Sequence, residues 1–446
     1  MARRERKTTA GARTLLAILL CLPLSLRGQV DHPAGSAPPP QTPSPNPAPG
    51  SHPPTLDDTI EAGDDEAGQP ARKLVNWNEF DLKFTTFRFG AGFLYDFAAF
   101  AQDAASKEQI EVHPTPKIRD DRLLFRGLFK TDRNISWSVG ILYDVPTKKW
   151  LFRQTQVMIA TPELWGDIVI GRTKEGVSLN KVMIGYAGWT NERATFSDAM
   201  LPILADGVKW LGYAPKKHLI WNLGAYGDRF SEGQTFSTYA HQVAGRVAWV
   251  PLMSEASEKV LHIGFNLRYG KPKDEMLQLR TRPEVFESPY FLDTGKFPAT
   301  QTRISGIEAY YRPRSLLVGT EYFFENVKSP EKGNPSFNGG DAFISWLPTG
   351  EVRVYNTRGG YFDQISPLRP VFSGGPGAWE LAGRFSYIDL DSGPVRGGKF
   401  WRITPVVNWH MSDNVRLEFV YGYGSLNRFN LVGKTQFFQT RVQLQF

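Results

Sequence analysis

The chain has 446 residues, of which 41% are hydrophobic and 13% aromatic, with 42 glycines and a formal net charge of +7. Outside the N-terminus it contains no run of about 18 apolar residues, which excludes helical membrane spans. A transmembrane β-barrel stays open, because its strands alternate apolar and polar side chains and never form such a run.

Residues 1–28 have the pattern of a secretory signal peptide. A basic start is followed by an apolar stretch from Leu15 to Leu26, and Gly28 is a plausible cleavage position. The chain's one cysteine, Cys21, lies in this stretch, and a lipoprotein box is the alternative, although Leu20 stands where that box prefers a small residue. After cleavage, disulfides, thiolate metal sites and cysteine nucleophiles are excluded.

Residues 29–70 are rich in proline and then acidic, as in Pro38-Pro39-Pro40 and Asp64-Asp65-Glu66. Such a segment buries too little apolar surface to fold, so we predict a disordered periplasmic tether. Of the 52 Lys and Arg and 45 Asp and Glu, residues 1–28 hold six and one, and residues 29–70 hold none and seven. The remaining domain, residues 71–446, is therefore modestly basic, which fits an anion-attracting lumen or contact with lipopolysaccharide.

From about Thr85 onward, short alternating segments follow one another, separated by Gly, Pro, Asn and Asp turns. Roughly sixteen such strands predict an all-β fold, a single closed antiparallel up-and-down transmembrane β-barrel that leaves no backbone group unpaired in lipid. The predicted strands are 87–103, 122–129, 137–144, 166–174, 219–228, 243–249, 261–269, 278–284, 305–312, 316–324, 342–346, 351–355, 379–390, 401–410, 416–423 and 438–446.

The last of these segments is the most regular. Phe438, Thr440, Val442, Leu444 and Phe446 alternate with polar residues, so one face suits lipid and the other water. A soluble all-β protein would bury the same apolar row. The position at the extreme C-terminus, ending on Phe446, favours the closing strand of a bacterial outer-membrane barrel that pairs back to the first strand.

Polar rows on several segments predict a wet lumen, because a charge facing lipid near the midplane costs about 2–4 kcal/mol. One example is Trp379 to Tyr387, where Glu380, Arg384 and Ser386 lie opposite apolar residues. Acids such as Glu308 or Glu321 are the alternative explanation for any single base, as its ion-pair partner. The bases that we expect to line the pore and bind anions are Arg122, Arg126, Arg172, Lys174, Arg246, Arg268, Arg280 and Arg282.

Several motifs between about residue 85 and Phe446 together resemble the phosphate-selective porin O and P family. They are Leu279-Arg280-Thr281-Arg282-Pro283-Glu284 with Phe291-Leu292-Asp293-Thr294-Gly295, the hairpin Ser345-Trp346-Leu347-Pro348-Thr349-Gly350-Glu351-Val352-Arg353-Val354-Tyr355, Ala378-Trp379-Glu380-Leu381 with Phe385-Ser386-Tyr387-Ile388-Asp389-Leu390, and Gly171-Arg172-Thr173-Lys174-Glu175. In the hairpin, Trp346 and Pro348 depart from the family pattern.

The resemblance implies a sixteen-stranded barrel, usually a homotrimer, with an inward-folded constriction loop lined by arginines and lysines. This loop would be residues 188–212, with Phe196-Ser197-Asp198-Ala199-Met200-Leu201-Pro202 matching a family segment. It is also the longest interruption of the alternation, which marks a functional loop; a cell-surface loop is the alternative. Asp120 stands where the family's arginine-rich strand commonly has another base, so anion preference is expected and phosphate itself is not specified.

An enzyme is the competing class, because some outer-membrane barrels carry Ser-His or Asp-His sites. The seven histidines include His262 and His410, which fit polar lumen positions and no nucleophile context. We therefore expect an outer-membrane porin with no catalytic residue, metal or cofactor, an anion preference, small anionic solutes, lipid and lipopolysaccharide as partners, and no nucleic acid. A weakly selective general porin, a barrel enzyme and a structural or adhesive barrel remain alternatives, which a planar-bilayer recording separates.

Overall fold

The computed structural model describes residues 78–144, 148–183, 185–228, 238–254 and 258–446. The predicted signal peptide and tether, residues 1–28 and 29–70, lie outside the described residues. No helix in the described part is both long enough and apolar enough to cross a membrane.

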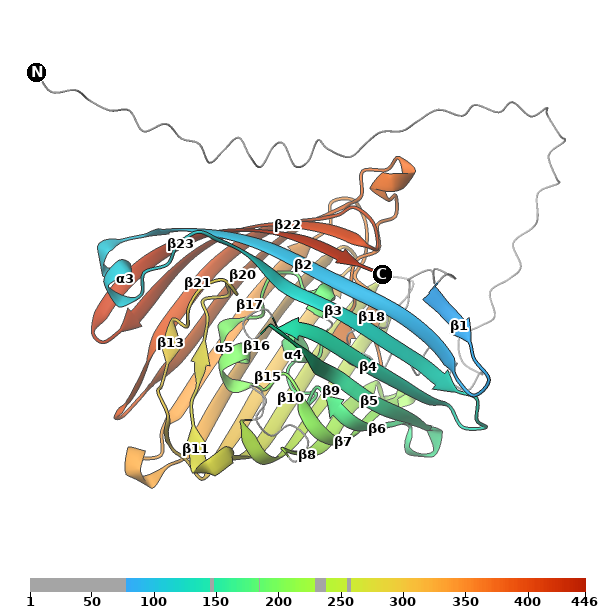
Figure 1. The fold of residues 1–446 in the computed structure, drawn as a ribbon, viewed down its shortest axis with the longest axis horizontal. Helices are drawn as coiled ribbons and strands as arrows, with labels where there is room; N and C mark the ends of the chain where they lie inside the picture. The colour runs from blue at the N-terminus through green and yellow to red at the C-terminus, as the bar shows by residue number, and fades with distance from the viewer. Residues whose placement is uncertain (1–77, 145–147, 184, 229–237, 255–257) are drawn as a thin grey trace, which may run out of the picture. The chain divides into compact units, whose positions relative to one another are not determined.

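Antiparallel strands form one continuous closed sheet (Figure 1). Within the described residues the sheet has 17 strands, of which β1 (Glu79–Asp81) only flanks the seam, so 16 strands make the barrel wall. The wall strands are β2 (Thr86–Gln102), β3 (Thr115–Phe129), β4 (Ile135–Asp144), β5 (Lys149–Thr161), β6 (Gly166–Thr173), β7 (Ala205–Ala214), β8 (Leu219–Gly227), β9 (Tyr239–Ser254), β10 (Lys259–Pro272), β15 (Gln301–Pro313), β16 (Leu316–Lys328), β17 (Ser336–Trp346), β20 (Ala378–Ser392), β21 (Val395–His410), β22 (Val415–Arg428) and β23 (Leu431–Gln445).

The barrel closes where β2 pairs with β23, from Gly92 opposite Gln445 to Gln102 opposite Thr435. Phe446 completes the seam, since its backbone N–H and carbonyl both bond to Ala91 at 3.0 and 3.1 Å. The predicted closure by the C-terminal strand is confirmed. Beyond the end of β23, β1 pairs with the same edge of β2, with Glu79 opposite Arg88.

Burial alternates along β23: its polar side chains are buried and its apolar side chains are exposed, as in a membrane barrel. Gln439, Arg441 and Gln443 are each only 3% exposed, whereas Phe438 is 46% exposed and Leu444 43% exposed. Because successive side chains of a strand point to opposite faces, the polar row faces the interior and the apolar row faces outward.

The predicted strand count is right, but two predicted strands are wrong and two were missed. Residues 278–284 and 351–355 lie in connections between wall strands, where the chain forms only short pairs of two-residue strands. The missed strands are β5, whose alternation is obscured by the polar run Arg153 to Gln156, and β7, whose Asp206, Gly207 and Gly212 resemble turn residues.

Three long connections reach residues on the inner wall. The first, residues 174–204 between β6 and β7, contains α4 (Leu179–Val182), a 3₁₀ turn (Gly185–Ala187) and α5 (Thr195–Met200). The others are residues 273–300 between β10 and β15, with β11 (Met276–Leu277), β12 (Arg280–Thr281), β13 (Leu292–Asp293) and β14 (Phe297–Pro298), and residues 347–377 between β17 and β20, with β18 (Tyr355–Asn356) and β19 (Tyr361–Phe362). The short helix α3 (Ala104–Gln109) lies in the connection between β2 and β3 and packs on β23.

The apolar core lies between these connections and inward-facing aromatics of the wall. Phe196 of α5 stacks on Phe323 of β16 with ring centroids 5.4 Å apart, and Trp189 stacks on Phe343 of β17 at 4.1 Å. Since β6 ends at Thr173 and β7 begins at Ala205, the connection spans residues 174–204. The predicted boundaries 188–212 were therefore wrong at both ends.

Candidate functional site

The connection between β6 and β7 contacts two opposite parts of the wall. On one side, Leu179 donates its backbone N–H to Glu308 of β15 at 2.9 Å and Asn180 donates to Glu321 of β16 at 2.8 Å. On the other side, Glu192 accepts from Arg119 of β3 at 2.5 Å and from Arg441 of β23 at 2.9 Å. Ser178 caps α4 by accepting from the Lys181 N–H at 3.3 Å.

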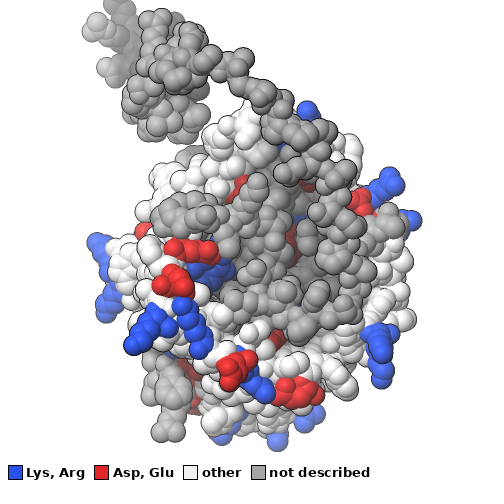
Figure 2. All heavy atoms as spheres, turned by 90° about the vertical axis from the view of Figure 1, so that its right-hand side faces the viewer, with Lys and Arg blue, Asp and Glu red and all other residues white. Residues whose placement is uncertain are grey.

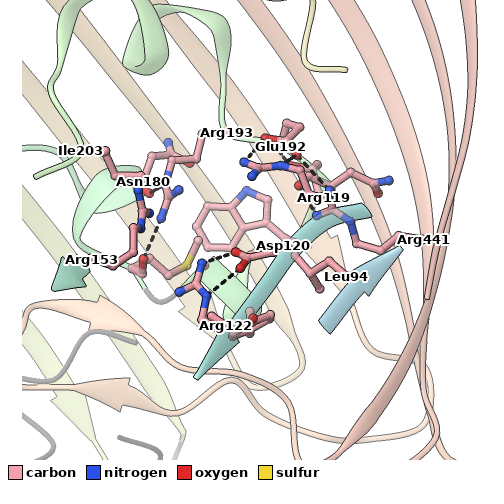
Figure 3. Close-up of a pocket in the computed structure, with 17 residues that line it drawn as sticks. Leu94, Arg119, Asp120, Arg122, Arg153, Asn180, Glu192, Arg193, Ile203 and Arg441 are labelled. Carbon is pink, nitrogen blue, oxygen red and sulfur yellow. Dashed lines mark hydrogen bonds and ion pairs between the residues drawn. The ribbon is translucent and has the colours of Figure 1, made fainter. Parts of the chain in front are cut away.

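Between this connection and the strands β2, β3, β5 and β23 lies a cavity of about 60 Å³ (Figure 3). A water molecule occupies about 30 Å³ in the liquid, so the cavity admits only a few waters. Its lining residues are Leu94, Arg119, Asp120, Arg122, Arg153, Asn180, Met183, Gly185, Tyr186, Gly188, Trp189, Thr190, Asn191, Glu192, Arg193, Ile203 and Arg441.

Cations outnumber anions around this cavity, with five arginines against Asp120 and Glu192. Figure 3 shows Arg153 on one side, Arg119 and Arg441 on the other, and Arg122 low in the view between them. The carboxylates pair with three of these arginines: Asp120 accepts from Arg122 at 2.9 Å through Nε, and Glu192 lies between Arg119 and Arg441. Arg193 donates to the Asn180 carbonyl at 2.7 Å, which ties it to its own connection.

Glu192 is ionised in this setting. Burial alone raises the pKa of its carboxyl, but the Arg119 and Arg441 guanidiniums outweigh burial and hold the pKa at about 2. For the nearby Lys181, burial lowers the pKa, and Asp198 at 2.9 Å opposes that shift. The site therefore combines fixed positive charge with one firmly ionised carboxylate.

One of the eight predicted pore-lining bases, Arg122, lines this cavity. Arg122 lines the cavity, is 5% exposed and lies over the Tyr186 ring at 5.0 Å. Arg126, on the same strand, is 8% exposed and is not among the lining residues. Arg172 of β6 pairs with Asp206 of β7 at 2.9 Å.

The next three predicted bases are engaged elsewhere in the lumen. Arg246 pairs with Glu308 at 2.6 Å, and Arg268 pairs with Glu175 at 2.5 Å. Lys174 is 2% exposed and donates to the Met183 carbonyl at 3.0 Å. These contacts match the alternative explanation, in which a lumen base serves as an ion-pair or hydrogen-bond partner.

Arg280 and Arg282 are not on a wall strand, because residues 278–284 fold into the connection between β10 and β15. Arg280 is exposed and lies over the Tyr290 ring at 4.3 Å. Arg282 lies over the same ring at 4.3 Å and donates to the Ser288 carbonyl at 2.9 Å. Their predicted placement on the barrel wall is wrong: the segment alternates, but it pairs with itself as β12 and β13.

The structure adds arginines that were absent from the predicted set: Arg119, Arg153, Arg193 and Arg441. Arg441 was visible in the polar row of the C-terminal segment, and Arg119 in the arginine-rich strand. Arg153 lies in the missed strand β5, and Arg193 lies in the connection, where no periodicity points inward.

His262 and His410 are buried on the inner wall. His262 lies 2.8 Å from Glu308 and His410 lies 3.3 Å from Glu380. Among the residues that the structure describes, no group of three or more His, Cys, Asp or Glu side chains is arranged to hold a metal ion.

Several charged side chains at the surface form exposed ion pairs. On the face shown in Figure 2, Lys and Arg side chains stand next to Asp and Glu side chains toward the rim. Exposed ion pairs such as Lys130–Asp81 at 2.5 Å and Arg133–Glu163 at 2.7 Å are screened by salt.

Known structures share this architecture. The outer-membrane protein OmpT of Vibrio cholerae is 10% identical, with a TM-score of 0.51 over 82% of this chain and all of that one. The outer-membrane channel DcaP of Acinetobacter baumannii is 9% identical, with a TM-score of 0.51 over 82% of this chain and 99% of that one. OmpF of Salmonella typhi is 8% identical, with a TM-score of 0.52 over 82% and 100%. At these identities the likeness shows the fold alone.

Sequence comparison adds a relative and a family. An uncharacterized protein of Caulobacter vibrioides is 29% identical over 182 residues, which span 40% of this chain and only 36% of that protein. The family model for phosphate-selective porin O and P matches residues 89–446. The chain therefore belongs to the phosphate-selective porin O and P family, as an outer-membrane porin of bacteria.

Proposed function

We propose that this porin forms a water-filled channel that favours small anions, such as phosphate or other oxyanions, over cations. The observation that carries the proposal is the excess of arginines around the cavity beside the β6–β7 connection. Ions that cross a narrow passage lose part of their hydration and therefore respond strongly to fixed charge. Arginine also offers a planar fork that exchanges hydrogen bonds with successive oxyanion oxygens.

The β6–β7 connection acts as the constriction in this proposal. Its far side covers wall carboxylates such as Glu308 and Glu321, which are 2% and 0% exposed. Its near side faces the arginines of β3, β5 and β23. Glu308 and Glu321 are thus covered by the connection, and five arginines against Asp120 and Glu192 leave a net positive charge around the cavity.

A weakly selective general porin is the second candidate. It is favoured by the ion pairs of Arg122 with Asp120 and of Arg119 and Arg441 with Glu192, which neutralise part of the positive charge. The channel fold and family support neither a nucleophile nor a hydrolytic site, so we propose no enzymatic activity. For assembly we propose a homotrimer; the V. cholerae OmpT protein is known in a trimer form.

Zero-current potentials across a planar bilayer in a salt gradient test the proposal. The wild-type channel is expected to give the sign of an anion-preferring pore, and Arg122→Glu with Arg153→Glu is expected to shift it toward cations. Arg133→Glu is the matched control, because that side chain is 49% exposed at a turn. A wild-type potential near zero that the double variant leaves unchanged would select the general porin.

A further inference from the structure

Three carboxylates face one another across neighbouring strands inside the barrel. Glu308 of β15 is directly opposite Glu321 of β16, and Glu321 is directly opposite Asp341 of β17. Their residues are 2%, 0% and 5% exposed. Like charges opposite each other in a sheet are destabilising, and burial adds to that cost. Such a row therefore needs donors that compensate it.

The donors come from three consecutive residues at the start of α4. Leu179 N–H donates to Glu308 Oε2 at 2.9 Å, and Asn180 N–H donates to Glu321 Oε1 at 2.8 Å. Ser178 Oγ donates to Glu321 Oε2 at 2.5 Å, and Asn180 Nδ2 donates to Asp341 Oδ2 at 3.3 Å. Every contact between this segment and the row runs from a donor on the connection to a carboxylate on the wall.

Backbone strain at the same point indicates that the wall holds the segment in place. Ser178 has φ 69° and ψ 129°, a conformation that residues other than glycine rarely adopt. Its N–H donates to Asn266 Oδ1 of β10 at 2.9 Å, and its hydroxyl donates to Glu321. A strained residue persists where surrounding contacts over-determine it, often at functional sites.

The segment also reaches the cavity. Asn180, bound to Glu321 and Asp341, is one of the cavity's lining residues, and its carbonyl accepts from Arg193, another lining residue. A change in how Asn180 is held therefore alters the cavity directly.

We propose that Glu308 and Glu321 form a latch that positions the β6–β7 connection, with Glu308 as its principal positioning residue, and that this latch sets the width of the channel; Asp341 is their neighbour in the row and not part of the latch. The proposal rests on the channel function proposed above. The latch consists of hydrogen bonds from donors on the connection to carboxylate oxygens on the wall. The connection is therefore held more firmly when more of these oxygens accept a hydrogen bond.

The three carboxylates differ in a way that provides a matched pair of variants. Both oxygens of Glu308 are occupied: Oε1 accepts from Arg246 at 2.6 Å and lies 2.8 Å from His262, and Oε2 accepts from Leu179 and from Asn266 at 3.2 Å. Asp341 Oδ1, by contrast, accepts no hydrogen bond. An amide nitrogen therefore meets a donor in Glu308→Gln but is tolerated in Asp341→Asn, although each variant replaces one carboxyl group of the same row by an amide.

A second pair acts from the connection and leaves the wall intact. Leu179→Pro removes the N–H that Glu308 accepts, at the first position of α4, where proline suits a helix. The ψ of 129° at Ser178 is compatible with a following proline. Leu179→Ala keeps the N–H and is its control for lost packing.

Single-channel recording of the full-length porin in planar bilayers is the first measurement. Glu308→Gln and Leu179→Pro are expected to raise the unitary conductance by about twofold or to split it into several levels. Asp341→Asn and Leu179→Ala are expected to keep the wild-type value. Equal conductance in Glu308→Gln, Leu179→Pro and the wild type, with the barrel folded, overturns the latch.

Trypsin cleavage gives a readout that does not depend on conduction. Lys181 and Arg193 lie in the connection and are expected to become cleavable in Glu308→Gln and Leu179→Pro, but not in the two controls. If the wild type conducts no ions, the channel proposal fails while this digestion still decides the latch. Digestion patterns that are the same in all five proteins would reject it.

Discussion

Arg353 and Glu380 form a two-pronged ion pair inside the barrel, with Arg353 Nη2 2.8 and 2.9 Å from the two carboxylate oxygens of Glu380. Both side chains are at most 1% exposed. Arg353 belongs to the β17–β20 connection and also donates to the Ala187 carbonyl of the β6–β7 connection at 2.9 Å. One arginine therefore joins the wall to two connections that enter the barrel from opposite ends.

Replacing Arg353 by methionine should destabilise the barrel strongly. Glu380 would stay buried without its guanidinium partner, which costs about 3–5 kcal/mol in comparable buried pairs. Urea unfolding of the refolded protein, followed by tryptophan fluorescence, measures the loss. The double variant Arg353→Met, Glu380→Gln should recover part of it, and Lys130→Met at an exposed pair should change little; no loss in Arg353→Met would show that the pair does not hold the connection.

Gly92 lets the β6–β7 connection approach β2 closely. A Cβ at this position would overlap the hydroxyl of Tyr186, which is 3% exposed. We expect Gly92→Ala to lower the free energy of unfolding by about 1–3 kcal/mol, the usual cost of overpacking, and to alter the unitary conductance by displacing Tyr186.

Gly185→Ala is the matched control, because a Cβ there would meet nothing within 4 Å. If the overlap is the cause, Gly92→Ala should lower the free energy of unfolding less in a Tyr186→Ala background than in the wild type. A Gly92→Ala protein that unfolds and conducts like the wild type would mean that Tyr186 moves aside freely.

Local alternation predicted most of the wall. The terminal strand, its closure through Phe446 and the polar rows around Glu380 and Arg441 follow from a period of two and from the cost of charge in lipid. Where polar residues cluster, as in Arg153 to Gln156 of β5, or where glycines interrupt, as in β7, the same pattern fails.

The candidate site was less accessible to sequence reasoning, because it is assembled by contacts between distant residues. Leu179 and Glu308 are 129 positions apart, and Arg441 and Glu192 are 249 positions apart. No local period encodes such pairings. Arg280 and Arg282 illustrate the converse: their alternation is real, but β12 pairs with β13 inside a connection and not with the wall.

The N-terminal segments make a prediction that rests on the sequence alone. We expect protein isolated from outer membranes to begin directly after Gly28, because a basic start and an apolar stretch precede it. Intact-mass measurement checks the start, and brief proteinase K treatment should trim residues 29–70 while the barrel survives. A retained apolar stretch would contradict the signal peptide, and a protected segment would contradict the tether.

Acid should weaken the hold of Arg119 and Arg441 on the β6–β7 connection through Glu192. Burial raises the pKa of Glu192, but the two guanidiniums prevail and lower it from 4.5 to about 2 in the folded protein. A carboxyl whose folded pKa is lowered stabilises the fold fully above its unfolded pKa, and this contribution is lost as the pH falls toward the folded pKa. The connection should therefore be held unchanged from neutral pH to about 4.5, and the hold should weaken between pH 4.5 and about 2.

Recordings across this range should show larger current fluctuations at the acid end, whereas Glu192→Gln should show them already at neutral pH and with little further change on acidification. An acid response in Glu192→Gln equal to that of the wild type would assign the titration to another carboxyl.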